Sequence, residues 1–322
     1  MMLRAICSLA ATAVAVPLVT APGLADPVVN GEFGVDNLRL RDLRRIYRGT
    51  INSNYFVSTD AGPAFLRVNE GKTAADARFE SELIWHLGSR GFLTPQLWRT
   101  RASEPYVMWR RSPHAAAQPV MLMTWIAAHE LTEHELTDSH AFLAGVLLGQ
   151  LHLCTAGFTL TRPGIYTVAR IKDRLQRLLR DVRAVAVAGP LLSDLQNQLQ
   201  EVGATRRRDL PGGIGHGDLF PDNLLFARRQ AGRPGQPHDA VFSLGPLGWI
   251  LDLEQAAALP FIYDVAVALL SFCAPVAAPW ALADPSLDAA DMARGRSPAL
   301  AAPAPEELIG PLRRTRAQAL LS

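Results

Sequence analysis

One short stretch constrains this 322-residue chain more than any other, the sequence GIGHGDLFPDNLLF at residues 213–226. Its three glycines allow tight or left-handed backbone turns. A strand-like run, NLLF, follows at once. The same stretch contains His216, Asp218, Pro221 and Asn223. A plain connection needs the glycines and the proline but not the other side chains. The stretch therefore predicts a rigid loop that carries out chemistry.

The side chains of this loop indicate phosphoryl transfer. A carboxylate held rigidly, as at Asp218, can accept a proton from an attacking hydroxyl group. Asn223 offers a hard, neutral oxygen that suits Mg²⁺. A later apolar run, GWILDLE, carries Asp252, and a charge there is costly unless it is paired or bound to a metal. If these two residues lie on neighbouring strands of one hairpin, they can share Mg²⁺, as transfer from ATP requires.

The nucleotide phosphates need a cradle, which we expect nearer the N-terminus. Asn52, Ser53 and Asn54 lie at a polar turn between two strand-like runs and are candidates to cover the phosphates of ATP. Arg67 follows on a predicted strand, at a position suited to a phosphate-anchoring cation. Glu80, on the next predicted helix, is placed to pair with Arg67. Taken alone, each of these two residues would more often lie on the surface.

Three further polar residues near the motif have simpler interpretations. We expect His216 to organise the loop through hydrogen bonds rather than to catalyse. Asp222 is expected to face solvent in a turn, and Asp264 to cap the helix that it opens.

The patterning predicts an α+β fold with two lobes. Strand-like runs begin at about residue 46, with a tight turn at 60–62, and a helix is expected over 74–91. Short strands are predicted at 93–100 and 119–126. The rest of the predicted elements are mostly helical. This gives a small lobe of antiparallel strands with one helix, and a larger, mainly helical lobe.

Beyond residue 126 the predicted elements can be placed individually. Helices are expected at 139–158, 167–188, 191–203 and 261–274, and short strands at 240–243 and 248–254. The division that we expect is an N-terminal extension (1–32), a nucleotide-binding lobe (33–125), a catalytic lobe (126–276) and an Ala- and Pro-rich tail (277–322).

Composition limits the partners and the location. The formal net charge is only +2, so neither nucleic acid nor a membrane is an expected partner. Cys7, Cys154 and Cys273 lie far apart in apolar stretches and are predicted to be small buried side chains. Residues 1–26 resemble a secretory signal peptide, which makes export an alternative to the cytoplasmic location that the use of ATP favours. The sequence sets no oligomeric state.

Four stretches carry a resemblance to a known superfamily: TINSNYFV, LIWHLGSRGFLTPQL, HGDLFPDNLLF and DLEQAAALPFIYDVAVAL. They resemble the aminoglycoside phosphotransferase and choline kinase superfamily, which has a protein-kinase-like fold. Within it, the chain looks most like the homoserine kinases of the small-molecule kinase type. The resemblance covers about residues 46–274.

The resemblance implies a role for each matching residue. Asp218 would be the catalytic base toward the acceptor hydroxyl, and Asn223 and Asp252 would hold Mg²⁺. Arg67 would stand where the phosphates of ATP are contacted, with its partner on the following helix. Adenine would lie near residues 121–126. The acceptor implied is L-homoserine, a step of threonine biosynthesis.

Two alternatives remain open at this point. One is another small hydroxyl acceptor in the same superfamily: an aminoglycoside, choline or ethanolamine, a hydroxylated amino acid, or a sugar. Aminoglycosides are polycations, and the absence of a dense acidic run in the larger predicted lobe disfavours them. The other is a non-catalytic nucleotide-binding, scaffold or exported protein.

Overall fold

A computed structural model describes residues 28–29, 32–33, 40–47, 51–132, 135–205, 209–227 and 248–273. The signal-like segment (1–26), the strand predicted at 240–243 and the tail from residue 277 lie outside the described residues.

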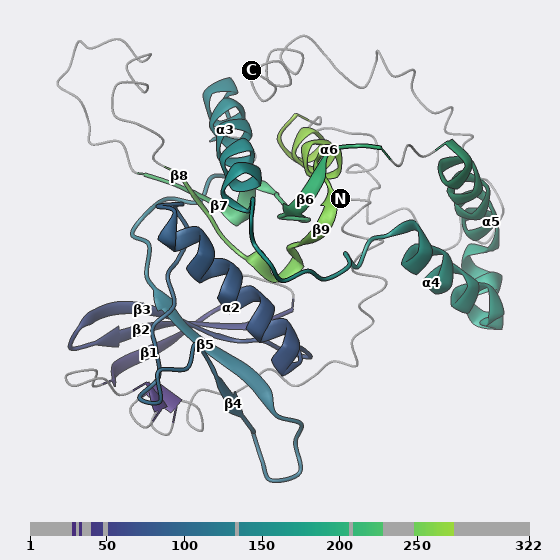
Figure 1. The fold of residues 1–322 in the computed structure, drawn as a ribbon. Coiled ribbons are helices and arrows are strands. Elements are labelled where there is room, and N and C mark those ends of the chain that lie inside the picture. The colour runs from purple at the N-terminus through teal and green to yellow at the C-terminus, as the bar shows by residue number, and fades with distance from the viewer. Residues whose placement is uncertain are drawn as a thin grey trace.

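The N-terminal part is a five-stranded antiparallel sheet in the order β1-β2-β3-β5-β4 (Figure 1). Its strands are β1 (Leu40–Ile46), β2 (Ser53–Thr59), β3 (Gly62–Val68), β4 (Val107–Trp109) and β5 (Gln118–Thr124). In β2, Tyr55 and Val57 are buried, whereas Asn54, Phe56 and Ser58, which alternate with them, are only partly buried, as a half-buried strand requires. The tight turn predicted between β2 and β3 is confirmed, with Gly62 at a φ of 112° that favours glycine.

Three details of the sheet differ from the sequence prediction. β1 begins at Leu40, before the expected start at about residue 46, because an edge strand can carry the charged sequence LRDLRRI at little cost. The strand predicted at 93–100 is reduced to a single bridge between Leu97 and Met123. The three-residue strand β4 had no sequence pattern long enough to predict it.

Helix α2 (Ala74–Ser89) confirms the helix predicted over 74–91. It starts with a capping box, in which Thr73 and Asp76 each accept a hydrogen bond from the backbone of the other. Phe79, Leu83 and Leu87 recur at helical spacing and are buried. The same helix also buries a charged residue, Glu80, which pairs with Arg67 of β3.

The C-terminal part is mainly helical, with two short two-stranded sheets between the helices (Figure 1). The helices are α3 (Asp138–Cys154), α4 (Val168–Arg180), α5 (Val182–Thr205) and α6 (Phe261–Phe272). The sheets pair β6 (Gly212–Gly215) with β9 (Ala257–Pro260), and β7 (Leu224–Phe226) with β8 (Gly248–Ile250). The kink at Ala188 and Pro190 within α5 falls at the break predicted between the helices at 167–188 and 191–203. The single helix predicted at 167–188 is wrong, because the extended backbone of Asp181 ends α4 and separates it from α5.

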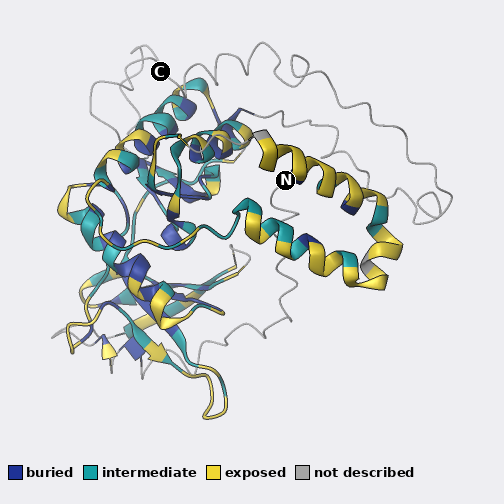
Figure 2. Ribbon diagram, turned by 45° about the vertical axis from the view of Figure 1, so that its right-hand side comes forward, coloured by how far each residue is buried: buried dark blue, intermediate teal, exposed yellow. Residues whose placement is uncertain are grey.

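One hydrophobic cluster joins the two parts of the molecule. It unites Leu83 of α2 with Leu147 of α3, Ile250 of β8 and Phe272 of α6. A second cluster, around Tyr55 and Leu66, is built on the five-stranded sheet. The sheet and the helical part therefore share a core, which fixes the elements that border the site. By contrast, α4 and α5 form a hairpin with largely exposed surfaces (Figure 2).

Two remaining expectations concern cysteines and membranes. Cys273 is buried and Cys154 is half-buried, and neither forms a disulfide in the part of the chain that the structure describes, while Cys7 lies outside it. Among the described helices, none combines the length and the apolar character needed to cross a bilayer.

Candidate active site

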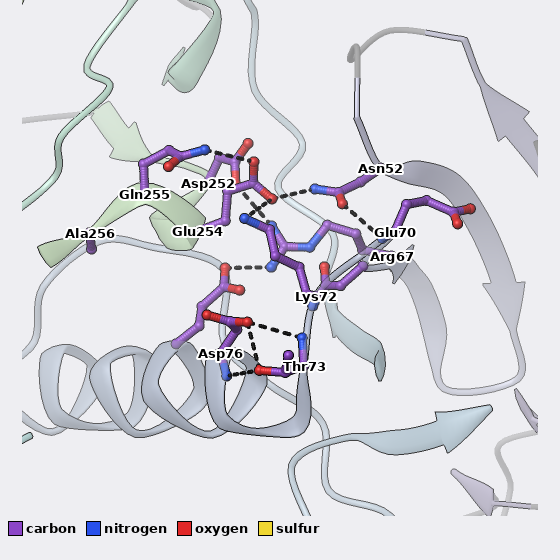
Figure 3. A network of polar contacts seen from close by, with 12 residues as sticks. Asn52, Arg67, Glu70, Lys72, Thr73, Asp76, Asp252, Glu254, Gln255 and Ala256 are labelled. Carbon is purple, nitrogen blue, oxygen red and sulfur yellow. Dashed lines mark hydrogen bonds and ion pairs between the residues drawn. The ribbon is translucent and has the colours of Figure 1, made fainter. Parts of the chain in front are cut away.

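A buried arginine connects three elements at the border between the sheet and the helical part. Arg67 of β3 forms ion pairs with Glu80 of α2 and with Asp252, which follows β8 (Figure 3). The distance from Nη1 to Oδ1 of Asp252 is 3.1 Å. The side chains of Arg67 and Glu80 are only 5% and 4% exposed, so the predicted pairing is confirmed and a surface position is excluded for both.

The surrounding carboxylates keep this arginine charged. Burial alone would lower the pKa of Arg67, but Glu80 and Asp252 raise it above its usual value. Both terminal nitrogens of Arg67 are engaged by carboxylates, whereas its Nε has no hydrogen-bond partner among the described residues. The guanidinium group therefore holds Asp252 in place, whatever contact it makes with a nucleotide.

The two predicted metal ligands lie at the same end of one hairpin. β7 pairs with β8 through Leu224 and Ile250, and the Leu251 amide donates to the Asn223 carbonyl at 2.8 Å. Asn223 directly precedes β7, and Asp252 is the second residue after β8. The Asn223 side chain donates through Nδ2 to the backbone carbonyl of Asp218 at 2.8 Å, which leaves Oδ1 as its acceptor.

Asp252 lies in an environment with an excess of negative charge. Its backbone is left-handed, with φ at 56°, which is uncommon for a residue other than glycine. Burial and the neighbouring Glu254 raise the pKa of Asp252 to about 7, with Glu80 and Asp218 adding to the effect and Arg67 opposing it. The segment before Asp252 is joined to the Asp218 loop through the hydrogen bond between His216 Nε2 and the Leu251 carbonyl.

This charge excess fits a bound cation. Among the described residues, no group of three or more His, Cys, Asp or Glu side chains converges on one point. Mg²⁺ does not require such a group, because it usually binds one or two carboxylates and completes its shell with water and substrate phosphates. The amide oxygen of Asn223 and the carboxylate of Asp252, at the same end of the β7–β8 hairpin, match that pattern.

The loop that carries Asp218 is held from behind by Asp264. This fully buried side chain accepts hydrogen bonds from the amides of His216 and Gly217, at 2.8 and 2.7 Å, and contacts Nε2 of His152 at 2.9 Å. The expectation that Asp264 caps a helix is wrong. Helix α6 begins after Pro260, without a side-chain cap, and the carboxylate is used to order the loop instead.

His216 organises the loop, as predicted. Its Nε2 donates to the Leu251 carbonyl at 2.8 Å, and its Nδ1 accepts from the Asp218 amide at 3.2 Å. Burial lowers the pKa of His216, although Asp264 opposes this effect, and a neutral ring fits both hydrogen bonds. The ring ties the segment before Asp252 to the loop of Asp218. Asp222 is exposed, as expected for a turn residue.

The three candidates at the phosphate-covering turn are in different positions. Asn52 reaches across to the helical part, where its Nδ2 donates to Glu254 Oε2 at 2.7 Å (Figure 3). Ser53 is fully buried and donates to Glu70 at 2.8 Å. Asn54 lies in β2, opposite Arg67 of β3. Asn52 is thereby joined to the segment that follows Asp252.

Two further polar residues of this region were not selected from the sequence. Glu254 is buried beside Asp252 and lies 3.8 Å from the ammonium nitrogen of Lys72. Glu254 is visible in the sequence ILDLE, two residues after Asp252, but nothing in the sequence indicates that it contacts Asn52. Lys72 is one of only two lysines in the chain, which was the only available signal for it.

The fold and this arrangement of residues define a kinase-like phosphotransferase, and the sequence comparisons agree. Residues 42–235 match the model of the phosphotransferase enzyme family. The chain is 28% identical to a homoserine kinase of Afipia carboxidovorans, over 77% of this chain and 69% of that protein. It is 31% identical to one of Pseudomonas aeruginosa, over 78% and 69%. The chain belongs to the phosphotransferase enzyme family, and its predicted class, a small-molecule kinase, is confirmed.

A comparison of structures supports the same fold. The chain is similar to a solved complex of an amicoumacin kinase with AMP-PNP and Ca²⁺, with a TM-score of 0.54. The similarity covers 73% of this chain and 65% of that one, at 13% sequence identity. The predicted α+β, protein-kinase-like fold is therefore confirmed.

The position of Gly217 generates a testable prediction. Its φ is 81°, and a Cβ atom there would lie 2.7 Å from the Gln255 carbonyl oxygen. Gly91 is also left-handed, with φ at 72°, but a Cβ atom there would meet nothing within 4 Å. We expect Gly91→Ala to cost about 1–2 kcal/mol of unfolding free energy from backbone strain alone. Gly217→Ala should cost more, because it also forces the loop of Asp218 away from the segment after Asp252.

Urea unfolding of both variants measures the two costs, and phosphotransferase assays follow activity. Gly217→Ala should lose activity, whereas folded Gly91→Ala should keep it. Equal stability costs with full activity in both would show that the close approach at Gly217 is unimportant.

Proposed function

We propose that this protein transfers the γ-phosphoryl group of ATP to the hydroxyl group of a small metabolite, with L-homoserine as the leading acceptor. The observation that carries the proposal is the convergence of the Asp218 loop with Asn223 and Asp252 at one end of the β7–β8 hairpin, facing buried Arg67. The curated homoserine kinases at 28–31% identity support the choice of acceptor.

In this proposal each residue has a defined task. The oxygen of the acceptor hydroxyl bonds to the γ-phosphorus, and Asp218 accepts the proton that this hydroxyl loses. The bond between the γ-phosphorus and the β–γ bridging oxygen breaks, which releases ADP. Asn223 and Asp252 hold Mg²⁺, which would neutralise charge on the phosphates. Arg67 and Glu80 keep the Asp252 carboxylate oriented. Asn52 covers the phosphate side from the β1–β2 turn, with Ser53 and Asn54 supporting that turn.

The parts of the chain are assigned accordingly. We propose residues 33–125 as the nucleotide-binding lobe and 126–276 as the catalytic lobe, with adenine near residues 121–126. Because ATP is the phosphoryl donor, we expect the reaction to take place in the cytoplasm.

Replacing the proposed base should separate chemistry from binding. In Asp218→Asn the side chain keeps its size but can no longer accept the hydroxyl proton. We expect kcat to fall roughly 10²- to 10⁴-fold. Binding of AMP-PNP with Mg²⁺, measured by calorimetry, should stay nearly unchanged. Normal turnover by Asp218→Asn would remove Asp218 from the role of base.

A panel of acceptors tests the proposed reaction itself. Purified full-length protein with Mg²⁺ and ATP is given L-homoserine, L-serine, choline, ethanolamine or kanamycin, and ADP release is followed by a coupled assay. We expect the highest kcat/KM with L-homoserine, and mass spectrometry should detect its O-phosphorylated product. Asp218→Asn serves as the background control.

The outcomes of the panel are distinct. Faster transfer to another hydroxyl compound would overturn the choice of L-homoserine while leaving the reaction class intact. Binding of nucleotide without transfer to any acceptor would favour a non-catalytic nucleotide-binding protein.

A further inference from the structure

Arg162 lies in the segment between α3 and α4, outside every motif of the site, yet its side chain contacts both the segment after Asp252 and helix α2. Its Nε donates to the Ala256 carbonyl at 2.7 Å, and Nη2 donates to the Glu254 carbonyl at 2.6 Å. Nη1 forms an ion pair with Asp76 of α2 at 3.3 Å. One planar guanidinium group therefore joins the turn that follows Asp252 to helix α2.

The position of Arg162 is itself fixed by its surroundings. Its guanidinium lies over the ring of Phe79, with 4.3 Å to the ring centroid, and the side chain is 19% exposed. Phe79 in turn meets Phe158 edge to face, and the Arg162 carbonyl accepts from the Ala258 amide at 2.9 Å. The guanidinium group of Arg162 is thus held against the ring face of Phe79.

The backbone groups that Arg162 satisfies belong to the segment carrying the proposed metal ligand. Leu253–Gln255 form a short 3-10 turn immediately after Asp252. The last carbonyls of such a turn lack partners within it. Arg162 donates to the carbonyl of Glu254 within this turn and to that of Ala256 at its C-cap, so it fixes the turn through its backbone.

The contacts form a closed ring. Asp252 binds Arg67, Arg67 binds Glu80, and Glu80 lies on α2 four residues after Asp76, on the same face of the helix. Asp76 pairs with Arg162, and Arg162 donates to the Glu254 carbonyl in the turn after Asp252, which closes the ring. Figure 3 shows Arg67, Asp252, Glu254 and Asp76 of this ring.

We propose that Arg162 is a positioning residue for phosphoryl transfer, which holds helix α2 against the Asp252 turn and so sets the geometry of the metal site. The inference rests on the proposed function. Arg162 touches neither Asp252 nor a reacting atom; it acts through the carbonyls at 254 and 256 and through Asp76. Its loss should loosen the metal site while the shared hydrophobic core holds the fold together.

The test compares Arg162→Met, which keeps an apolar stem over Phe79, with Arg162→Lys, which keeps one charge but cannot span three acceptors. The Mg²⁺ dependence of turnover and of AMP-PNP binding is measured for both. We expect Arg162→Met to raise the half-saturating Mg²⁺ concentration by up to about 10-fold, less than loss of a direct partner of the metal ligand would, and to lower kcat. Arg162→Lys should recover part of this loss. KM for the acceptor should change little.

Two further variants keep the test decisive. Asp76→Asn preserves an oxygen for the Thr73 cap but removes the charge that faces Arg162, so it should shift the Mg²⁺ dependence in the same direction, less than additively with Arg162→Met. Arg177→Met removes an exposed ion pair with Asp173 on α4 and should change nothing. If Arg162→Met does not fold, Arg162→Lys and Asp76→Asn still give the result.

The outcomes separate this inference from the proposed function. Unchanged Mg²⁺ dependence in folded Arg162 and Asp76 variants of an active enzyme would overturn the inference alone. If the wild type transfers phosphate to no acceptor, the proposed function fails, whereas weaker Mg²⁺-dependent AMP-PNP binding by the variants would still support the role of Arg162.

Discussion

The site depends on the ion pairs of one buried cation, Arg67. A guanidinium group that is 5% exposed is tolerable only because two carboxylates from other elements face it. Removing one partner of such a cluster typically costs about 3–5 kcal/mol, because a charge is then left buried and unpaired. β3, α2 and the turn after β8 are therefore held in one arrangement. As a consequence, Asp252 is held at the end of the β7–β8 hairpin where Asn223 precedes β7.

A second consequence is electrostatic. Arg67 does not balance the carboxylates around it, since Glu254, Glu80 and Asp218 all contribute to raising the pKa of Asp252. A divalent cation would relieve this excess, whereas a phosphate chain without a metal would add to it. The charges thus favour a metal–nucleotide complex over a free nucleotide. Asn52 and Lys72 come from the sheet part of the molecule and both contact Glu254, next to these carboxylates.

The sequence predicted elements and residues wherever a local pattern was strong. The β2–β3 hairpin, α2, α3 and the pairing of Arg67 with Glu80 followed from alternation, helical spacing and charge placement. β1 was placed too late because its charged residues conceal the alternation of an edge strand. Asp264 and Arg162 act through contacts with residues distant in sequence, which no local pattern records. The assembly of the ring around Asp252 is therefore a property of the tertiary structure.

The most direct measurement is the position of the metal in crystals of the full-length protein grown with Mn²⁺ and AMP-PNP. The anomalous signal of Mn²⁺ identifies the ion without reference to the assigned roles. We expect a Mn²⁺ ion roughly 2–2.5 Å from a carboxylate oxygen of Asp252 and from Oδ1 of Asn223, bridging to the nucleotide phosphates. A nucleotide whose Mn²⁺ ion contacts neither side chain would contradict it.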